Sequence, residues 1–130
     1  MYLAAKQLLI KIDEIIELKE KMFELYLKNQ QEKYVIFKNK LESLLYNCTI
    51  NDLVTVIAIC NIGRCERGHR QLADGSTEFF KIDILENEDQ LLEKHSKYLR
   101  YKTKEELTFY ILRNSAVHQN LSEGKLILNF

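Results

Sequence analysis

The chain has 130 residues, of which 46% are apolar and 29% are charged. This length suits one domain with one buried core, and the composition excludes wholesale disorder. Lysine plus arginine and aspartate plus glutamate both number 19, so the net charge near neutrality is zero. Zero net charge excludes a long-range field that would by itself attract nucleic acid or an anionic membrane. Any binding to such a partner requires a local patch.

The short apolar segment at the N-terminus is interrupted by Lys6, Lys11 and Asp13 well before it reaches the length of a secretory signal or a membrane span. We therefore expect a cytoplasmic protein that does not associate with membranes. The three cysteines are an odd number without a dense framework, which fits reduced thiols better than disulfides. Four glycines and no proline leave long helices unbroken and favour an all-α fold over a sheet-rich one.

Residues 2–46 contain neither glycine nor proline, and their apolar side chains recur at the three- and four-residue intervals typical of helices. The polar stretch 28–33 interrupts this stripe. One long helix could cross a solvated zone there, but ordinary helix lengths favour two helices that form a hairpin.

Residues 53–62 form an apolar run, and either Thr49 or Asn51 can cap a helix that contains it. Gly63 supplies an end for this helix. The β-branched residues in the run leave a buried strand as an alternative, but the length of the run and Gly63 favour a buried helix.

The glycine-rich segment 63–78 predicts a loop, in which Asp74-Gly75 can turn a small β-hairpin around residues 72–84. Two more helices are expected, over residues 87–100 and 103–120.

Thr103 and Glu106 have the spacing of a capping box at the start of the last helix, and Gly124 ends it. Together these elements predict a single domain over residues 1–130, folded as a bundle of four to five helices.

The segment Arg113–His118 stands out in this last helix because it reads Arg-Asn, three further residues and then His. This pattern resembles the HEPN superfamily, whose members are small helical bundles with an Arg, a polar residue that is commonly Asn, three variable residues and a His. Many members are metal-independent ribonucleases of toxin pairs, abortive-infection systems and type VI CRISPR effectors. The resemblance covers about eight residues and implies Arg113, Asn114 and His118 as catalytic residues.

The chemistry of the motif agrees with that activity. RNA cleavage without a metal needs a group that moves the proton of the 2′-hydroxyl and a cation that stabilises the phosphorane. His118 can move the proton, and Arg113 can supply the positive charge. On one continuous helix these two side chains would diverge by roughly 140°, since each residue turns the helix by about 100°. The resemblance therefore implies a homodimer in which Arg and His come from both subunits, and it implies a setting of toxin or phage conflict.

Basic residues precede the motif, with Tyr98 and Tyr101 among them, and such a surface can hold phosphates and stack bases. Six carboxylates in the same region oppose this reading, because they largely cancel the positive charge. The residues that we expect to contact RNA are Lys97, Arg100, Lys102 and Lys104.

A zinc site built from Cys60, Cys65 and His69, with His95 or Cys48, is the alternative chemistry. The spacing matches neither a zinc finger nor a zinc ribbon, and Cys60 lies in an apolar run where cysteine acts as a small hydrophobe. We therefore expect no metal and no cofactor.

A second resemblance covers more of the chain but implies no activity. The run 53–64 and the later segment 121–124 look like a family of short bacterial helical proteins of unknown function, in which an apolar helix ends in Gly-Arg and a later helix ends in Leu-x-Glu-Gly. In that case residues 64–80 are an insertion. The alternative function is then a non-catalytic helical module that binds another protein, such as a phage or mobile-element inhibitor of a host defence protein, through the N-terminal helices.

Overall fold

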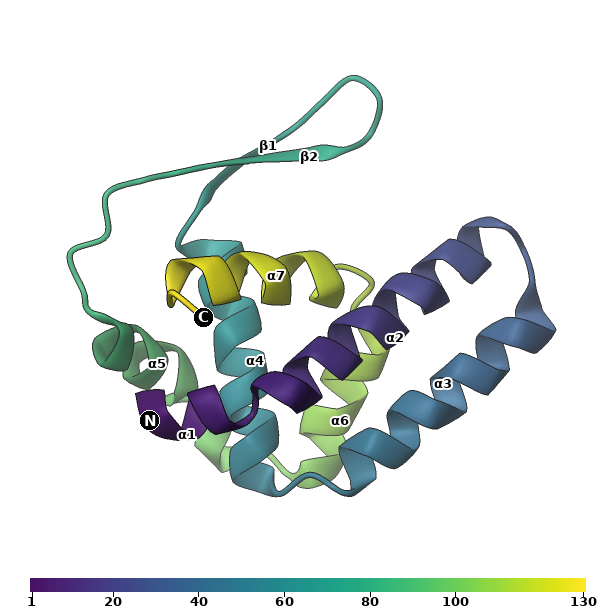
Figure 1. Ribbon diagram of the computed structural model, residues 1–130, viewed down its shortest axis with the longest axis horizontal. Coiled ribbons are helices and arrows are strands. Elements are labelled where there is room, and N and C mark those ends of the chain that lie inside the picture. The colour runs from purple at the N-terminus through teal and green to yellow at the C-terminus, as the bar shows by residue number, and fades with distance from the viewer.

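The computed structural model describes residues 1–130 and is mostly helical, as predicted (Figure 1). It contains seven α-helices, more than the four to five expected, together with one 3-10 turn and one two-stranded antiparallel hairpin. In chain order the elements are α1 (Tyr2–Gln7), α2 (Leu9–Leu27), α3 (Gln31–Tyr46), α4 (Ile50–Cys65), β1 (Gly68–Gln71), β2 (Thr77–Phe80), α5 (Glu88–Ser96), the 3-10 turn η1 (Leu99–Tyr101), α6 (Lys104–Arg113) and α7 (Val117–Ile127).

Helix α4 is the centre of the core, which confirms the predicted buried helix and excludes the strand. Ten of its residues are buried, and α7, α5, α6 and α1 pack against it. Thr49 caps its start: the Asp52 N–H donates to the Thr49 hydroxyl, and the Asp52 carboxylate accepts from the Thr49 N–H, each at 3.0 Å. This reciprocal pair satisfies two N–H groups that have no partner inside the helix.

Helices α2 and α3 form the hairpin predicted for the N-terminal region, and their common end projects from the rest of the molecule (Figure 1). The turn lies in the polar stretch, where Asn29 adopts a φ of 57°, a left-handed conformation that Asn tolerates better than most residues. A further break at Leu8, which the apolar spacing did not predict, separates α1 from α2.

Two glycines expected to end helices lie inside them. Helix α4 continues past Gly63 to Cys65, and α7 continues past Gly124 to Ile127. A Cβ on Gly63 would collide with the Asn120 carbonyl of α7, and a Cβ on Gly124 would collide with the Ile59 carbonyl of α4. These glycines therefore allow two helix backbones to touch.

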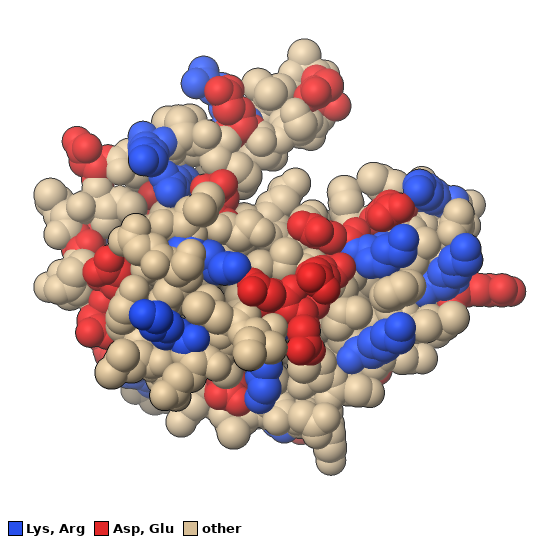
Figure 2. Space-filling view, viewed as in Figure 1, with Lys and Arg blue, Asp and Glu red and all other residues tan.

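The β-hairpin lies slightly earlier than expected, and part of the segment predicted as a loop belongs to α4 and β1. Its register pairs Gly68 with Phe80 and Gln71 with Thr77. Gly75 has a φ of +86°, so the predicted Asp74-Gly75 turn is confirmed. The hairpin projects from the helical body as a narrow arm (Figures 1 and 2).

The helix expected over residues 87–100 is shorter than predicted. Asn87 caps α5, which ends at Ser96, and η1 follows it. No single helix of this chain has the length and hydropathy of a membrane span, although α3 and α4 taken together across a bend of 120° pass by length and composition.

Candidate functional site at the junction of helices 6 and 7

The predicted helix over residues 103–120 is broken within the Arg-Asn-x-x-x-His motif. Its start is correct, because the capping box between Thr103 and Glu106 is formed. Helix α6 ends at Arg113, Asn114 has an extended ψ of 113°, and α7 begins only at Val117. The Asn114 side-chain oxygen accepts the Ala116 N–H at 3.0 Å, a local bond that competes with helical pairing and turns the chain.

This break changes the geometry of the motif. Arg113 ends one helix, whereas His118 lies in the first turn of the next, so the divergence of 140° calculated for one helix does not apply. Asn114 and His118 do not share a helix face either. Instead, the segment between them forms a junction that is free to direct its side chains toward different neighbours.

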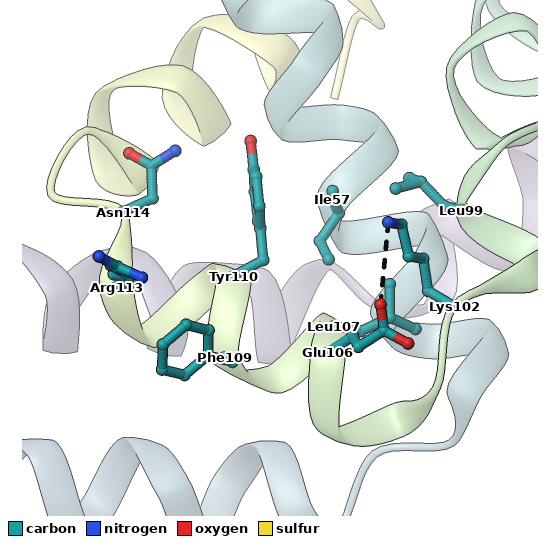
Figure 3. Close-up of a pocket in the computed structure, with 9 residues that line it drawn as sticks. All are labelled: Ile57, Leu99, Lys102, Glu106, Leu107, Phe109, Tyr110, Arg113 and Asn114. Carbon is teal, nitrogen blue, oxygen red and sulfur yellow. Dashed lines mark ion pairs between the residues drawn. The ribbon is translucent and has the colours of Figure 1, made fainter.

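Arg113 and Asn114 line a pocket of about 400 Å³ beside the junction (Figure 3). Its apolar part comes from α4, η1 and α6, namely from Ile57, Leu99, Leu107, Phe109 and Tyr110. Figure 3 shows Arg113 and Asn114 at one end of the pocket and Lys102 with Glu106 at the other. The pocket therefore joins two of the predicted catalytic residues with one of the predicted RNA-binding residues.

The guanidinium of Arg113 lies 5.4 Å from the centre of the Phe109 ring, a cation–π contact. No ion pair involves Arg113, which leaves its donors available. At the far end of the pocket, the Lys102 ammonium lies 3.8 Å from the Glu106 carboxylate, and both side chains are exposed. An exposed pair at this distance is weak.

Arg113 also lines a second pocket, of about 300 Å³, between α2, α3 and the junction. Besides Arg113 this pocket contains a second cation, Lys19, and a hydroxyl, Ser115. Its other lining residues are Met22, Phe23, Tyr26, Tyr34 and Leu112. Two cations and three aromatic rings thus surround one hollow that no carboxylate lines.

Lys19 is a member of the site that the sequence analysis missed. Its side chain is 4% exposed, and its ammonium donates a 3.0 Å hydrogen bond to the carbonyl of Leu112, in the last turn of α6. Burial lowers the pKa of Lys19 to about 8. The signal was present in the sequence, because Lys19 continues the apolar stripe of Ile12, Ile15 and Met22 at helical spacing.

His118 is buried at 8% exposure and lines neither pocket directly. Its ring packs against Phe23, with the two ring centres 5.4 Å apart, and Phe23 is part of the second pocket. Burial lowers the pKa of His118, with Lys19 acting in the same direction and Glu20 in the opposite one. The Nδ1 atom is buried and has no hydrogen-bond partner.

Two of the four residues predicted to bind RNA have polar partners within the protein. Arg100 donates to both carboxylate oxygens of Glu93, at 3.0 and 2.8 Å, and Lys104 donates to the carbonyl of Tyr46 at 2.6 Å. Lys97 makes no ion pair, and Lys102 alone reaches the pocket of Arg113.

The wider surface carries both signs of charge. On the face shown in Figure 2, acidic side chains gather near the middle of the view and several basic side chains gather to the right of them, so both signs of charge are present. An anion would therefore be recognised by the local cations of the junction and not by the field of the whole molecule.

No three Cys, His, Asp or Glu side chains lie together in a way that could hold a metal ion. Cys60 is buried, whereas Cys65 is exposed. His95 faces Glu66, with 2.8 Å between Nε2 and Oε1, so it belongs to the packing of α5 against the end of α4.

The junction therefore combines groups suited to one kind of ligand: guanidinium and ammonium groups for an anion, and aromatic rings for a flat, apolar body. Comparison with protein-family models, with curated proteins and with solved structures finds no match for this chain.

Proposed function

We propose that this protein binds single-stranded RNA at the α6–α7 junction and cleaves it without a metal, as a homodimer in a toxin or phage-conflict setting. The observation that carries the proposal is the pocket in which Arg113, Asn114 and Lys102 meet the rings of Phe109 and Tyr110. Positive side chains beside aromatic rings are what single-stranded nucleic acid requires, since the former hold phosphates and the latter stack on bases.

The protonation states also support cleavage. A histidine whose pKa lies below its usual value is neutral at neutral pH, which is the form that accepts a proton as a general base. In the proposed reaction His118 takes the proton of the 2′-hydroxyl, whose oxygen attacks the adjacent phosphorus. The phosphorus–O5′ bond breaks, the leaving O5′ takes up a proton from water, and protonated His118 returns its proton to the solvent. The products are a 2′,3′-cyclic phosphate and a 5′-hydroxyl. Arg113 stabilises the negative charge that develops on the phosphorane.

The homodimer follows from the resemblance to HEPN proteins, in which two motifs face each other. It agrees with the position of His118, which lies one side chain away from the second pocket of its own chain, behind Phe23. Both subunits would then contribute to one site.

The decisive experiment measures cleavage of single-stranded RNA by the purified protein in the presence of EDTA. We expect products with cyclic phosphate ends, and we expect His118→Ala and Arg113→Ala each to reduce the rate by about a hundredfold to ten-thousandfold. His69→Ala and Arg70→Ala are the matched controls, because they remove the same side-chain types from the exposed β-hairpin. The far-UV circular dichroism of all four variants should equal that of the wild type.

Absence of cleavage by the wild type over a range of RNA substrates would rule out the enzyme. Unfolding of the His118 and Arg113 variants, with active controls, would show that the motif serves packing.

The second candidate function, a non-catalytic module that binds another protein, is favoured by a different surface. At the free end of the α2–α3 hairpin, large apolar side chains are open to solvent: Tyr26, Leu27, Val35 and Ile36 are 70%, 67%, 49% and 54% exposed. Several such side chains gathered at one end of a projecting element are typical of an interaction site.

A further inference from the structure

Arg113 has an unusual position because it belongs to both pockets of the junction. One pocket lies on the α4 and η1 side of α6, with Phe109 and Tyr110 in its wall. The other lies on the α2 and α3 side, with Tyr26 and Tyr34 in its wall. A group bound to the Arg113 guanidinium thus has an aromatic hollow on each side.

The two pockets match the chemistry of a nucleotide in similar ways. Their volumes of about 400 and 300 Å³ lie at the lower end of those that hold small molecules. The only carboxylate that lines either pocket is Glu106, which lies at the Lys102 end and away from Arg113. No carboxylate therefore lines either pocket next to Arg113.

Lys19 gives the second pocket its own cation. An ammonium group has three N–H donors, and only one of them is used, in the bond to the Leu112 carbonyl. The side chain is 4% exposed and lines the pocket, so its remaining donors are held in place without a partner from the protein.

We infer that the junction recognises two consecutive nucleotides of single-stranded RNA, with the phosphate between them on Arg113 and one base in each pocket. The base in the first pocket stacks on Phe109, and the base in the second stacks on Tyr26 and Tyr34, beside Lys19. This inference rests on the proposed RNA ligand, but it does not depend on cleavage.

The test measures the affinity for a fluorescent oligoadenylate of ten nucleotides that carries 2′-O-methyl groups, which prevent cleavage. We expect Phe109→Ala and Tyr26→Ala, one variant for each pocket, to weaken binding by about tenfold each, since a stacked base contributes about 1–3 kcal/mol. Tyr26→Phe keeps the ring and should bind as the wild type does. Phe80→Ala removes an aromatic ring of the β-hairpin that is 42% exposed and lines neither pocket, and it should also bind normally.

The outcomes separate the two proposals. If the wild type does not bind the oligoadenylate or other single-stranded RNA, the proposed function fails. If RNA binds and requires Arg113, but Tyr26→Ala and the double variant Tyr26→Ala/Tyr34→Ala bind like the wild type, the proposed RNA ligand stands and the two-nucleotide arrangement is wrong. Tyr26 is 70% exposed, so its replacement by alanine leaves the core intact and the comparison valid.

Discussion

Lys19 is the residue at which charge and packing conflict most strongly. It occupies a core position of α2, where the neighbouring turns place Ile15 and Met22 inside the protein. Removal of an ammonium group from water is unfavourable, and the protein compensates with the carbonyl of Leu112, which belongs to the last turn of α6 and has no helical partner beyond it. The break in the helix at Asn114 and the buried lysine therefore depend on each other.

The first prediction concerns the stability of this arrangement against pH. The pKa of Lys19 is about 8 in the folded protein and 10.5 in the unfolded chain, so between these values only the unfolded chain holds the proton. Unfolding then takes up a proton, and a rise in pH favours the folded state. We expect the free energy of unfolding of the wild type to rise relative to that of Lys19→Met as the pH goes from 8 to about 10.5. The gain should approach about 3 kcal/mol, at about 1.4 kcal/mol for each pKa unit.

Urea denaturation at several pH values measures this difference. Other groups that titrate at alkaline pH, such as Tyr110, whose pKa is raised by burial, are present in both proteins, so their contributions largely cancel. The matched control is Lys21→Met, because the Lys21 side chain is 44% exposed on the same helix. Parallel curves for the wild type and Lys19→Met would contradict a lysine whose pKa is lowered by burial.

At the scale of elements, the contact between α4 and α7 is the most extensive in the molecule. Gly63 of α4 faces the Asn120 carbonyl, and Gly124 of α7 faces the Ile59 carbonyl. Each helix therefore has a glycine where the backbone of the other helix approaches too closely for a side chain. Because the motif residue His118 lies in the first turn of α7, this contact also fixes where the junction lies relative to the core.

The second prediction is that Gly63→Ala destabilises the protein by about 3 kcal/mol or more, since the added methyl group forces two backbones apart. The sign of the effect is informative. In an ordinary exposed helix the same change stabilises by about 1 kcal/mol, because alanine has the higher helix propensity. Thermal or chemical denaturation measures the effect, and Gly124→Ala should behave in the same way. Gly75→Asn in the hairpin turn is the control, because Asn tolerates the positive φ there, and it should change stability by less than about 1 kcal/mol.

At the scale of the whole molecule, the α2–α3 hairpin stands apart from the body. Helix α3 buries only Leu41 and Leu45, both in its C-terminal half, while Val35 and Ile36 near its start are open to solvent. The end of the hairpin therefore has few contacts with the rest of the protein and retains apolar surface that a second protein can cover.

The third prediction is that the protein is a dimer at micromolar concentration, as the two-subunit site requires, and that Val35 and Ile36 contribute to the contact. Sedimentation velocity measures the state. We expect the double variant Val35→Lys/Ile36→Lys to sediment as a monomer and Ile10→Lys, which alters an exposed apolar residue on a different part of α2, to remain dimeric. A wild type that is strictly monomeric would contradict the two-subunit ribonuclease and would leave the apolar end free for a different protein.

Local signals in the sequence were sufficient for most of the elements. The all-α class, the helical hairpin with its polar turn, the caps at Thr49 and Thr103 and the Asp74-Gly75 turn follow from the conformational preferences of a few adjacent residues. Such preferences act within one or two turns of chain, which is why they can be read without the fold.

Contacts between distant segments decided the rest. Gly63 and Gly124 have the sequence appearance of helix ends, and only the close approach of α4 to α7 shows that they lie inside helices. The break at Asn114 is stabilised by Lys19, which lies 93 residues away in sequence from the carbonyl to which it donates a hydrogen bond. Because of this break, Arg113 faces two pockets, whereas His118 lies buried beside Phe23. The sequence alone thus determined the residue types of the candidate site, whereas the geometry of the site and its buried cation depend on tertiary packing. The free energy of a close backbone contact or of a buried charge is set by neighbouring groups, and the linear sequence does not place these neighbours together.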